Sequence, residues 1–466
     1  MSRKFLRIAV LIMAFALVAA ACGDDDASTT TAAPATTAAP ATTEAPTTTA
    51  AATTTEAPTT TEAMPMGLAC GDGVTVGVIT DLTGALAIYG AHMNRGIPIG
   101  FSYATGGEIQ TGTEQTYMLE DCEIRVVFKD DQSDPELSAT AARELVEVEG
   151  AQILIGSVSS GVTATLQGIA RENDVILIAA PAAATDLTGK DFDPNTFRAS
   201  RSNYQDGMAI CDQFVNTDGY ETFVQIAPDY SFGYGGAQAY KDACEFFGGE
   251  FIADDIFAPA DTTDFTTFLE PLAGTEADAF LVTWVGGGFV PLLQAAIDLG
   301  VVDDDTVLGS PFVDNVVMPI FFGNAVGTTS VILYQYGAPD NAANDYLVAS
   351  QAAVGGTVPD LFDADGMNAA IMAVEALKAT NGAADAESLR NALEGLVFEG
   401  PKGTIEIRAE DHMAIQDMYV VTLTGFDEAT TFPIYEQVAT VRPVPPCLLE
   451  GDYLDRCGSL PVGSLG

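Results

Sequence analysis

Short apolar runs alternate with segments of helical spacing from Val74 onward. Four apolar runs predict strands, at residues 74–79, 124–128, 153–155 and 175–178. Helical spacing lies between them at residues 135–149 and 161–173, and Pro135 suits the first turn of a helix. Strands that alternate with helices favour a parallel sheet covered by helices.

The same alternation starts again after Arg201. Helices are predicted at residues 204–215, 236–247, 264–273 and 290–299, and across 341–396. Strands are predicted at residues 222–226, 251–256, 279–283, 330–334, 404–407 and 418–423. About 400 residues exceed what one core usually organises. We therefore expect an α/β protein with two doubly wound, parallel-sheet lobes and a cleft between them.

The loops that follow the strands are the expected place for a site, because ligands of such sheets bind beyond the carboxyl ends of the strands. These loops span residues 80–90, 156–161, 179–188, 228–235, 284–289 and 309–315.

The N-terminus has the layout of an export signal. Arg3, Lys4 and Arg7 precede an apolar run over residues 8–21, which is short for a membrane span, although a single-pass anchor stays an alternative. Residues 17–23 resemble the bacterial lipoprotein box, in which the cysteine, here Cys22, becomes the lipid-bearing N-terminus. Ala19 stands where the box usually has leucine, and ordinary cleavage after an A-x-A site is the alternative.

A segment rich in Thr, Ala and Pro follows the cysteine, within residues 22–69. Its composition cannot bury enough apolar surface to offset the entropy of ordering, so it is predicted to be a disordered tether, or alternatively a glycosylated stalk. With residues 1–21 as signal peptide, both interpretations place the body outside the cell, held at the outer face of the membrane.

Charge and cysteine content narrow the function further. A net charge of −47, from 18 basic and 65 acidic residues, argues against nucleic acid or anionic lipid as partners.

Without Cys22, an even set of six cysteines remains in an oxidising compartment, which predicts three disulfides. Proximity supports only the pair Cys447 and Cys457. The chain has no C-x-x-C pair and only two histidines, so no metal and no cofactor are expected.

Several motifs resemble the branched-chain amino acid type of periplasmic binding protein, which serves ATP-driven importers. They are VGVITDLTG at 76–84, DDQSDP at 130–135, IGSVSSG at 155–161 and GPKG at 400–403. The resemblance covers nearly all of residues 74–423, and the order and spacing of the motifs make it specific.

The resemblance implies a hinge of three chain crossings, near Ala199, Tyr334 and Arg408. Lobe 1 would then comprise residues 70–199 and 335–407, lobe 2 residues 200–334 and 408–446, and the tail residues 447–466. It also implies that Cys70 pairs with Cys122. Cys211 and Cys244 lie on successive predicted helices of lobe 2 and are expected to pair there.

Ser160 is the leading ligand-binding candidate. It precedes a predicted helix start, where unpaired N–H groups favour a carboxylate, although a simple helix cap is the alternative. By the family pattern, the backbone at Ala182 and Ala183 would accept hydrogen bonds from a ligand ammonium. Ala184 and Pro311 depart from that pattern, since a hydroxyl and an acidic residue usually stand there, and Asp314 is the candidate substitute.

Tyr89, Phe232 and Trp284 lie in the site loops and are expected to form a pocket wall, with burial in the core as the alternative. The glycines at 286–288 lack the sequence of a phosphate-binding loop. No nucleophile and base stand together, so an enzyme is not expected.

These observations predict a monomeric solute-binding lipoprotein that hands a small molecule to the permease and ATPase of an ABC importer. A sensor that docks to a signalling receptor is the alternative, since the same fold supports both. The expected ligand is a carboxylate or amide with an apolar body, with a branched-chain amino acid as the nearest alternative.

Overall fold

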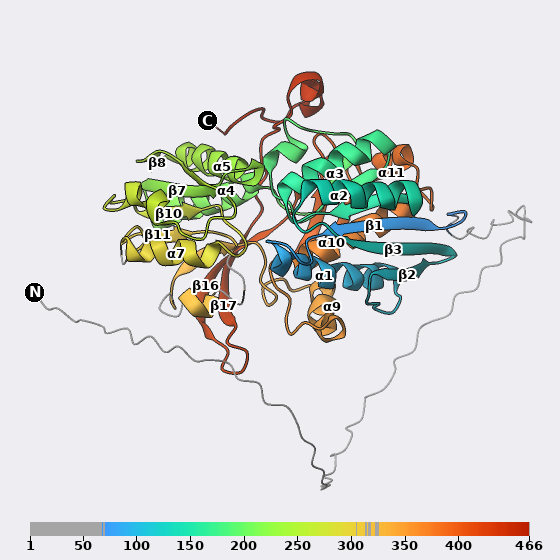
Figure 1. Ribbon diagram of the computed structural model, residues 1–466, viewed down its shortest axis with the longest axis horizontal. Coiled ribbons are helices and arrows are strands. Elements are labelled where there is room, and N and C mark those ends of the chain that lie inside the picture. Colours follow the sequence, from blue (N-terminus) through green and yellow to red (C-terminus); the bar gives the residue numbers. More distant parts are fainter. Residues whose placement is uncertain are drawn as a thin grey trace, which may run out of the picture. The chain divides into compact units, whose positions relative to one another are not determined.

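The computed structural model describes Leu68 and residues 70–465, with gaps at 304, 313–314, 316–317 and 322–325 (Figure 1). These residues belong to one compact unit. The predicted signal peptide, Cys22, nearly all of the predicted tether and Asp314 lie outside the described residues. Within the described part, no helix combines the length and apolar character that crossing a bilayer requires.

The first sheet, which defines lobe 1, has six strands in the order β2-β3-β1-β4-β5-β6. Only β2 runs antiparallel to its neighbour. The strands are β1 (Val74–Thr80), β2 (Glu114–Leu119), β3 (Cys122–Asp130), β4 (Ala151–Gly156), β5 (Ile176–Ala179) and β6 (Thr196–Arg198). The central strands are almost wholly buried, as expected for a parallel sheet covered on both faces.

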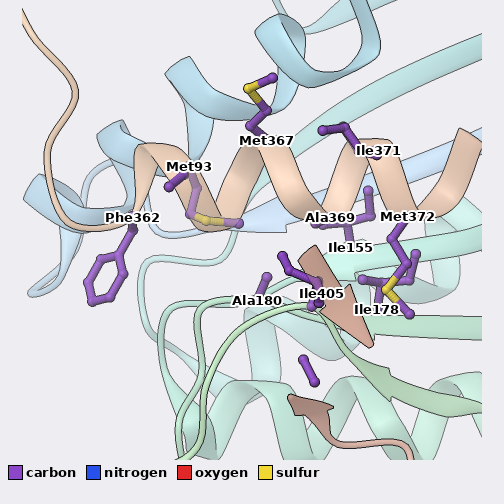
Figure 2. Packing of buried hydrophobic residues seen from close by; sticks show 14 of the residues in the cluster. Met93, Ile155, Ile178, Ala180, Phe362, Met367, Ala369, Ile371, Met372 and Ile405 are labelled. Atoms are coloured by element: carbon purple, nitrogen blue, oxygen red, sulfur yellow. The ribbon is translucent and has the colours of Figure 1, made fainter. Parts of the chain in front are cut away.

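Helices cover both faces of this sheet. On one face lie α2 (Pro135–Arg143), a π-helical turn (Glu144–Val148) and α3 (Ser160–Asn173); on the other lie α1 (Ala87–Thr105) and α10 (Asp363–Ala379) (Figure 1). Alternate strand residues pack on opposite faces, so Ile79 contacts the α2 and α3 side while Val78 packs with the core of α1 and α10. Figure 2 shows residues of this second core, where Met367 and Met372 project from α10.

Close packing of α1 on α10 depends on glycine. A Cβ at Gly96 would lie 2.1 Å from the carbonyl oxygen of Asp363, and one at Gly100 would lie 2.6 Å from that of Met367. Arg95 adds two hydrogen bonds to the Asp363 carboxylate, at 3.0 and 2.8 Å. This contact fixes the start of α10, and with it Phe362, the residue just before the helix.

The rest of lobe 1 comes from later in the chain. It comprises α9 (Ala342–Ser350), a 3-10 turn (Gln351–Val354), α11 (Ala386–Leu393), and the antiparallel strands β13 (Val397–Gly400), β14 (Gly403–Ile407) and β15 (Ala414–Ile415). The continuous helical segment predicted at 341–396 is thus divided, because glycines at 355, 356 and 382 and Pro359 interrupt it.

Lobe 2 is built on a second, wholly parallel sheet in the order β11-β10-β7-β8, with β9 also paired to β7. Its strands are β7 (Thr222–Pro228), β8 (Glu250–Phe251), β9 (Ile256–Ala258), β10 (Ala279–Val282) and β11 (Val307–Gly309). Its helical segments are α4 (Asn203–Cys211), a π-helical turn (Asp212–Asp218), α5 (Ser231–Phe247), α6 (Thr266–Leu269), a 3-10 turn (Glu270–Leu272), α7 (Phe289–Asp298) and α8 (Met318–Phe321).

A small antiparallel sheet of β12 (Thr329–Ile332), β16 (Met418–Phe426) and β17 (Pro433–Val441) adjoins lobe 2. The chain passes between the two sheet systems after β6, after β12, and between β15 and β16. This third passage lies later than the predicted Arg408, because β15 still pairs with β14 through Glu406 and Ile415. The predicted fold class of two doubly wound lobes is confirmed.

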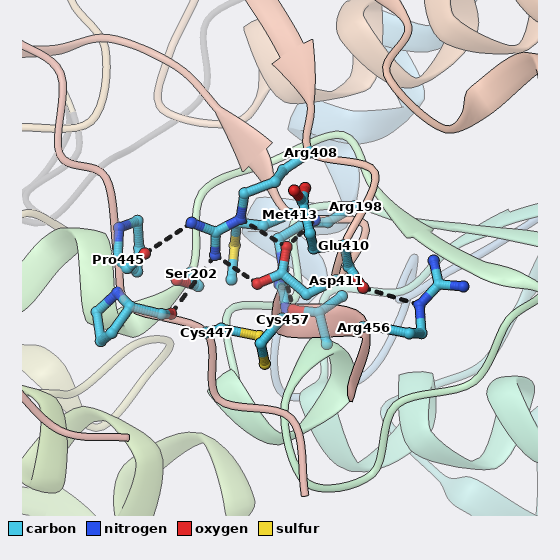
Figure 3. Close-up of polar contacts among 12 residues, drawn as sticks. Arg198, Ser202, Arg408, Glu410, Asp411, Met413, Pro445, Cys447, Arg456 and Cys457 are labelled. Atoms are coloured by element: carbon cyan, nitrogen blue, oxygen red, sulfur yellow. Dashed lines mark hydrogen bonds and ion pairs between the residues drawn. A yellow bond between two sulfur atoms is a disulfide. The ribbon is translucent and has the colours of Figure 1, made fainter. Parts of the chain in front are cut away.

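Arg408 instead holds the C-terminal segment. Its guanidinium donates to the Asp411 carboxylate and, at 2.7 Å, to the carbonyl of Pro445 (Figure 3). The short helix Gly451–Cys457 follows, closed by a disulfide between Cys447 and Cys457.

All three predicted disulfides are present. Cys70 pairs with Cys122, which ties the start of β1 to β3, and Cys211 pairs with Cys244, which joins α4 to α5. The third is the tail pair described above.

Candidate ligand-binding site

A narrow cavity lies where the carboxyl ends of strands from both lobes meet. Its lining comes from both lobes and from the first crossing: Tyr89, Val158, Pro181, Ala183, Arg201, Tyr230, Phe232, Val285, Phe312 and Phe362. A wider groove lies beside the C-terminal segment, next to Tyr204 and Glu450. The narrow cavity is the candidate site, because both sheets direct their loops to it.

The loop after β1 positions Tyr89. The Asp81 carboxylate accepts hydrogen bonds from the backbone N–H groups of Gly84 and Leu86 and from the Ser133 hydroxyl. A Cβ at Gly90 would lie 1.5 Å from the carbonyl oxygen of Asp81, so only glycine fits there. The Tyr89 hydroxyl accepts from the backbone N–H of Gly286 at 3.4 Å and thereby joins lobe 1 to lobe 2.

Ser160, the first residue of α3, lies just behind the cavity wall. It is buried, and its hydroxyl accepts a hydrogen bond from the backbone N–H of Ala184 at 3.2 Å. Ser159 is the N-cap and accepts from the N–H of Val162 at 3.4 Å. Val158, rather than Ser160, lines the cavity. Direct contact of Ser160 with a ligand stays a prediction.

The loop after β5 is held by internal donors. Arg198 donates to the carbonyls of Ala182 and Ala184, and the carbonyl of Ala183 accepts from the N–H of Asn203 at 2.8 Å. Burial lowers the pKa of Arg198 to about 9, so the side chain stays protonated at neutral pH. Ala183 lines the cavity and Ala182 does not.

Arg201 brings a positive charge to the cavity and is fully buried. One guanidinium nitrogen, Nη1, donates to the carbonyl of Pro181 at 2.8 Å, and Nε lies 3.4 Å from Oδ1 of Asp206. The Cζ atom of the guanidinium lies 5.1 Å from the ring centroid of Phe312 and 5.5 Å from that of Phe362. It is the one charged side chain among the described residues that line the cavity.

Aromatic rings make most of the wall. Phe232 contacts Phe312 with ring centroids 5.6 Å apart, and Tyr89 contacts Phe362 at 5.3 Å, both edge to face. Burial raises the pKa of Tyr230, so its hydroxyl is protonated at neutral pH and can donate a hydrogen bond.

Trp284 does not line the cavity. It is buried in the core of lobe 2, edge to face with Phe265 at 4.8 Å, and its neighbour Val285 reaches the cavity instead. The side chain of Trp284 points away because consecutive residues after a strand alternate in direction.

Three buried charged side chains, Asp206, Asp365 and Lys402, interact electrostatically with Arg201. Burial raises the pKa of Asp206 to about 6, against the opposing effect of Arg201 and Lys402. Lys402, from the turn between β13 and β14, lies 3.8 Å from Asp365 of α10, and both are buried. Burial lowers the pKa of Lys402 and raises that of Asp365.

His92 is uncharged at neutral pH. It lies one turn after Tyr89 on α1, and burial, with the charge of Arg95, lowers its pKa to about 3. Its 3.9 Å contact with Asp360 is therefore not an ion pair at neutral pH.

Sequence reasoning missed Arg201, Tyr230, Phe312 and Phe362. Tyr230 and Phe312 lie inside loops expected to hold the site, so their aromatic character was a usable signal. Arg201 directly follows the first crossing, and Phe362 reaches the cavity only through the packing of α10 on α1. Nowhere in the described ranges do three metal-ligating side chains gather into a site.

Comparison with known proteins agrees with this geometry. A family model described as periplasmic binding protein matches residues 73–429. The Leu/Ile/Val-binding protein homolog 6 of Brucella melitensis is 25% identical over 376 residues, which are 78% of this chain and 91% of that protein.

Two solved structures from Rhodopseudomonas palustris are similar. An ABC-type branched-chain amino acid transporter protein is 31% identical, with a TM-score of 0.65 and coverage of 79% of this chain and 96% of that one. An ABC transporter solute-binding protein in complex with benzoate is 26% identical, with a TM-score of 0.67 and coverage of 80% and 97%.

The two lobes and the cavity between them define a solute-binding protein of the type I periplasmic fold. The chain belongs to the periplasmic binding protein family, as the motifs of its sequence indicate. Membership implies an extracytoplasmic location.

Proposed function

We propose that this protein captures a small organic molecule between its lobes and delivers it, without chemical change, to an ABC importer. The observation that carries the proposal is the cavity itself, because each lobe supplies about half of its wall. A ligand held there contacts both lobes only when they are closed, so binding and closure are one event.

The lining indicates the kind of molecule. Five aromatic rings and four aliphatic side chains surround a small space, which suits a ligand with an apolar body. The names of the relatives support small organic ligands, since they mention leucine, isoleucine and valine in one case and benzoate in another.

Delivery and anchoring complete the proposal. Cys22 carries the lipid, the Thr/Ala/Pro-rich segment is the tether, and the permease and ATPase of the importer are the partners. A Cys22→Ser variant is expected to be released from the membrane in the native host. Retention of that variant in the membrane fraction would contradict the anchor.

Small-angle scattering with a ligand panel tests capture between the lobes. Leucine, isoleucine, valine and benzoate are each added to the soluble Cys22→Ser chain. At least one is expected to lower the radius of gyration and raise the melting temperature, since ligand at about 100 times its Kd stabilises the folded state by about 2.7 kcal/mol. Tight binding with no change in the radius would contradict closure.

A further inference from the structure

We propose that Arg201 is the specificity-determining residue of the cavity and that it holds the carboxylate of an apolar, aromatic acid that has no α-amino group. The inference rests on the proposed function and names the ligand class for the same site. Four observations carry it: the unused donors of Arg201, the rings beside it, the occupied carbonyls of the neighbouring loop, and the lack of a carboxylate in the described wall.

The guanidinium has more donors than partners. A guanidinium carries five N–H groups. In Arg201, Nη1 donates to the carbonyl of Pro181, and Nε lies 3.4 Å from Oδ1 of Asp206, which is longer than a good hydrogen bond. No hydrogen bond links Nη2 to any residue that the structure describes. Buried donors are almost always paired in folded proteins, so these N–H groups at the cavity wall are suited to a ligand acceptor.

The rings of Phe312 and Phe362 set the orientation of this fork. Guanidinium groups stack on aromatic faces, and here one ring comes from each lobe. The planar group is therefore held in place when the lobes are closed. A carboxylate is the ligand group that matches such a fork with two parallel hydrogen bonds.

An α-ammonium group has few acceptors in the same wall. The carbonyls of Pro181, Ala182 and Ala184 accept from the two arginines, and that of Ala183 accepts from Asn203. No carboxylate lines the described part of the cavity. A buried ammonium without acceptors is costly, so the wall disfavours amino acids.

The aromatic wall selects the rest of the ligand. Phe232 contacts Phe312 and Tyr89 contacts Phe362, both edge to face, so the rings beside Arg201 continue into the rest of the wall. Aromatic rings prefer such contacts with another ring. A ligand with a flat apolar body and one carboxylate satisfies both the rings and the charge.

Calorimetric titration of the full-length protein, with no substitution in its cavity, against benzoate, benzamide and leucine tests the inference. Benzamide has nearly the shape of benzoate without its charge. Benzoate is expected to bind, with benzamide and leucine each about tenfold weaker or more, because hydrogen bonds to a charged group are the stronger ones. This comparison needs no variant and so does not depend on the folding of one.

The Arg201→Lys variant adds a second measurement, with Arg171→Lys on the exposed surface as matched control. Lysine keeps a positive charge beside Asp206 but loses the planar fork. Benzoate affinity is expected to fall about tenfold in Arg201→Lys and to stay unchanged in the control, with circular dichroism confirming that both fold.

The outcomes separate the two proposals. Benzamide binding as tightly as benzoate, or Arg201→Lys folding normally and binding benzoate as before, would overturn the role of Arg201. Leucine binding more tightly than benzoate, with closure in scattering, would overturn the ligand class and leave the proposed function standing. No binding of any of the three would overturn the ligand class, and an unchanged radius of gyration with the wider panel would then overturn the proposed function as well.

Discussion

Arg198 and Arg201 lie three residues apart at the first crossing, and both are buried, yet the structure uses them differently. Arg198 donates its hydrogen bonds to the loop after β5, where the carbonyls of Ala182 and Ala184 and the hydroxyl of Thr188 accept them. Arg201 makes one hydrogen bond, to the carbonyl of Pro181, its Nε faces Asp206 at 3.4 Å, and its side chain lines the cavity.

Arg198 therefore has a structural role, whereas Arg201 is the candidate for ligand binding. Two neighbouring arginines of equal burial are distinguished only by how many of their donors the fold already satisfies. Arg198 is fixed by acceptors from its own chain, whereas Arg201 is fixed by rings that leave its hydrogen-bonding capacity available.

Arg198→Met is expected to have the largest effect. It leaves two buried carbonyls without donors, each at a cost of about 1 to 3 kcal/mol, and the melting temperature should fall by about 5 °C or more. Calorimetry on the ligand-free protein measures this. A loss for Arg198→Met no larger than for Arg201→Lys would break the comparison.

Ser160→Ala is expected to have an intermediate effect. The backbone N–H of Ala184 loses its acceptor, which costs about 1 to 3 kcal/mol and loosens the loop that carries Ala183. Ligand affinity should fall a few-fold, in line with the role predicted from the sequence. Ser159→Ala is the control, because it removes only a helix cap worth about 1 kcal/mol. Equal affinity of wild type and Ser160→Ala would remove Ser160 from the site.

The pH dependence of benzoate binding is expected to be the smallest effect. Asp206 faces Arg201, Lys402, Asp365 and Tyr240, and its pKa is raised to about 6, chiefly by burial. A ligand carboxylate on Arg201 raises that pKa further, so the complex takes up protons and affinity increases as pH falls from 8 to 6. The gain is up to about tenfold for each unit by which binding raises the pKa.

Benzamide is the control for this titration, since a neutral ligand should show little dependence over the same range. Benzoate affinity that is constant, or that falls, between pH 8 and pH 6 would show that Asp206 does not interact with the bound carboxylate.

The sequence predicts the central strands of both sheets, because runs such as residues 74–79 are apolar throughout, as buried parallel strands require. The strand predicted at 251–256 is two short strands, β8 and β9, and the sequence does not predict the edge strands β2, β6 and β11 or the late strand β17. It does not predict α1, since Gly96, Pro98 and Gly100 conceal the helical pattern. Those glycines are present because α10 packs against them, a contact between residues far apart in the chain.

The site residues likewise divide into those that the local sequence predicts and those that only tertiary contacts explain. Tyr89, Ala183 and Phe232 were predicted because they follow strands, and the cavity includes all three. Trp284 also follows a strand but faces the core. Arg201 follows β6 by three residues, and nothing local distinguishes it from Arg198. The difference lies in the tertiary structure, which places Phe312 and Phe362 beside Arg201 and supplies Arg198 with carbonyl acceptors.

Mass spectrometry of the ligand that copurifies with the protein from its native host tests the central claim most directly. Gentle purification should retain a small molecule in the closed cavity, and unfolding should release it for identification. The account predicts an aromatic or otherwise apolar carboxylic acid without an α-amino group. Recovery of leucine, isoleucine or valine in amounts equal to the protein would contradict it.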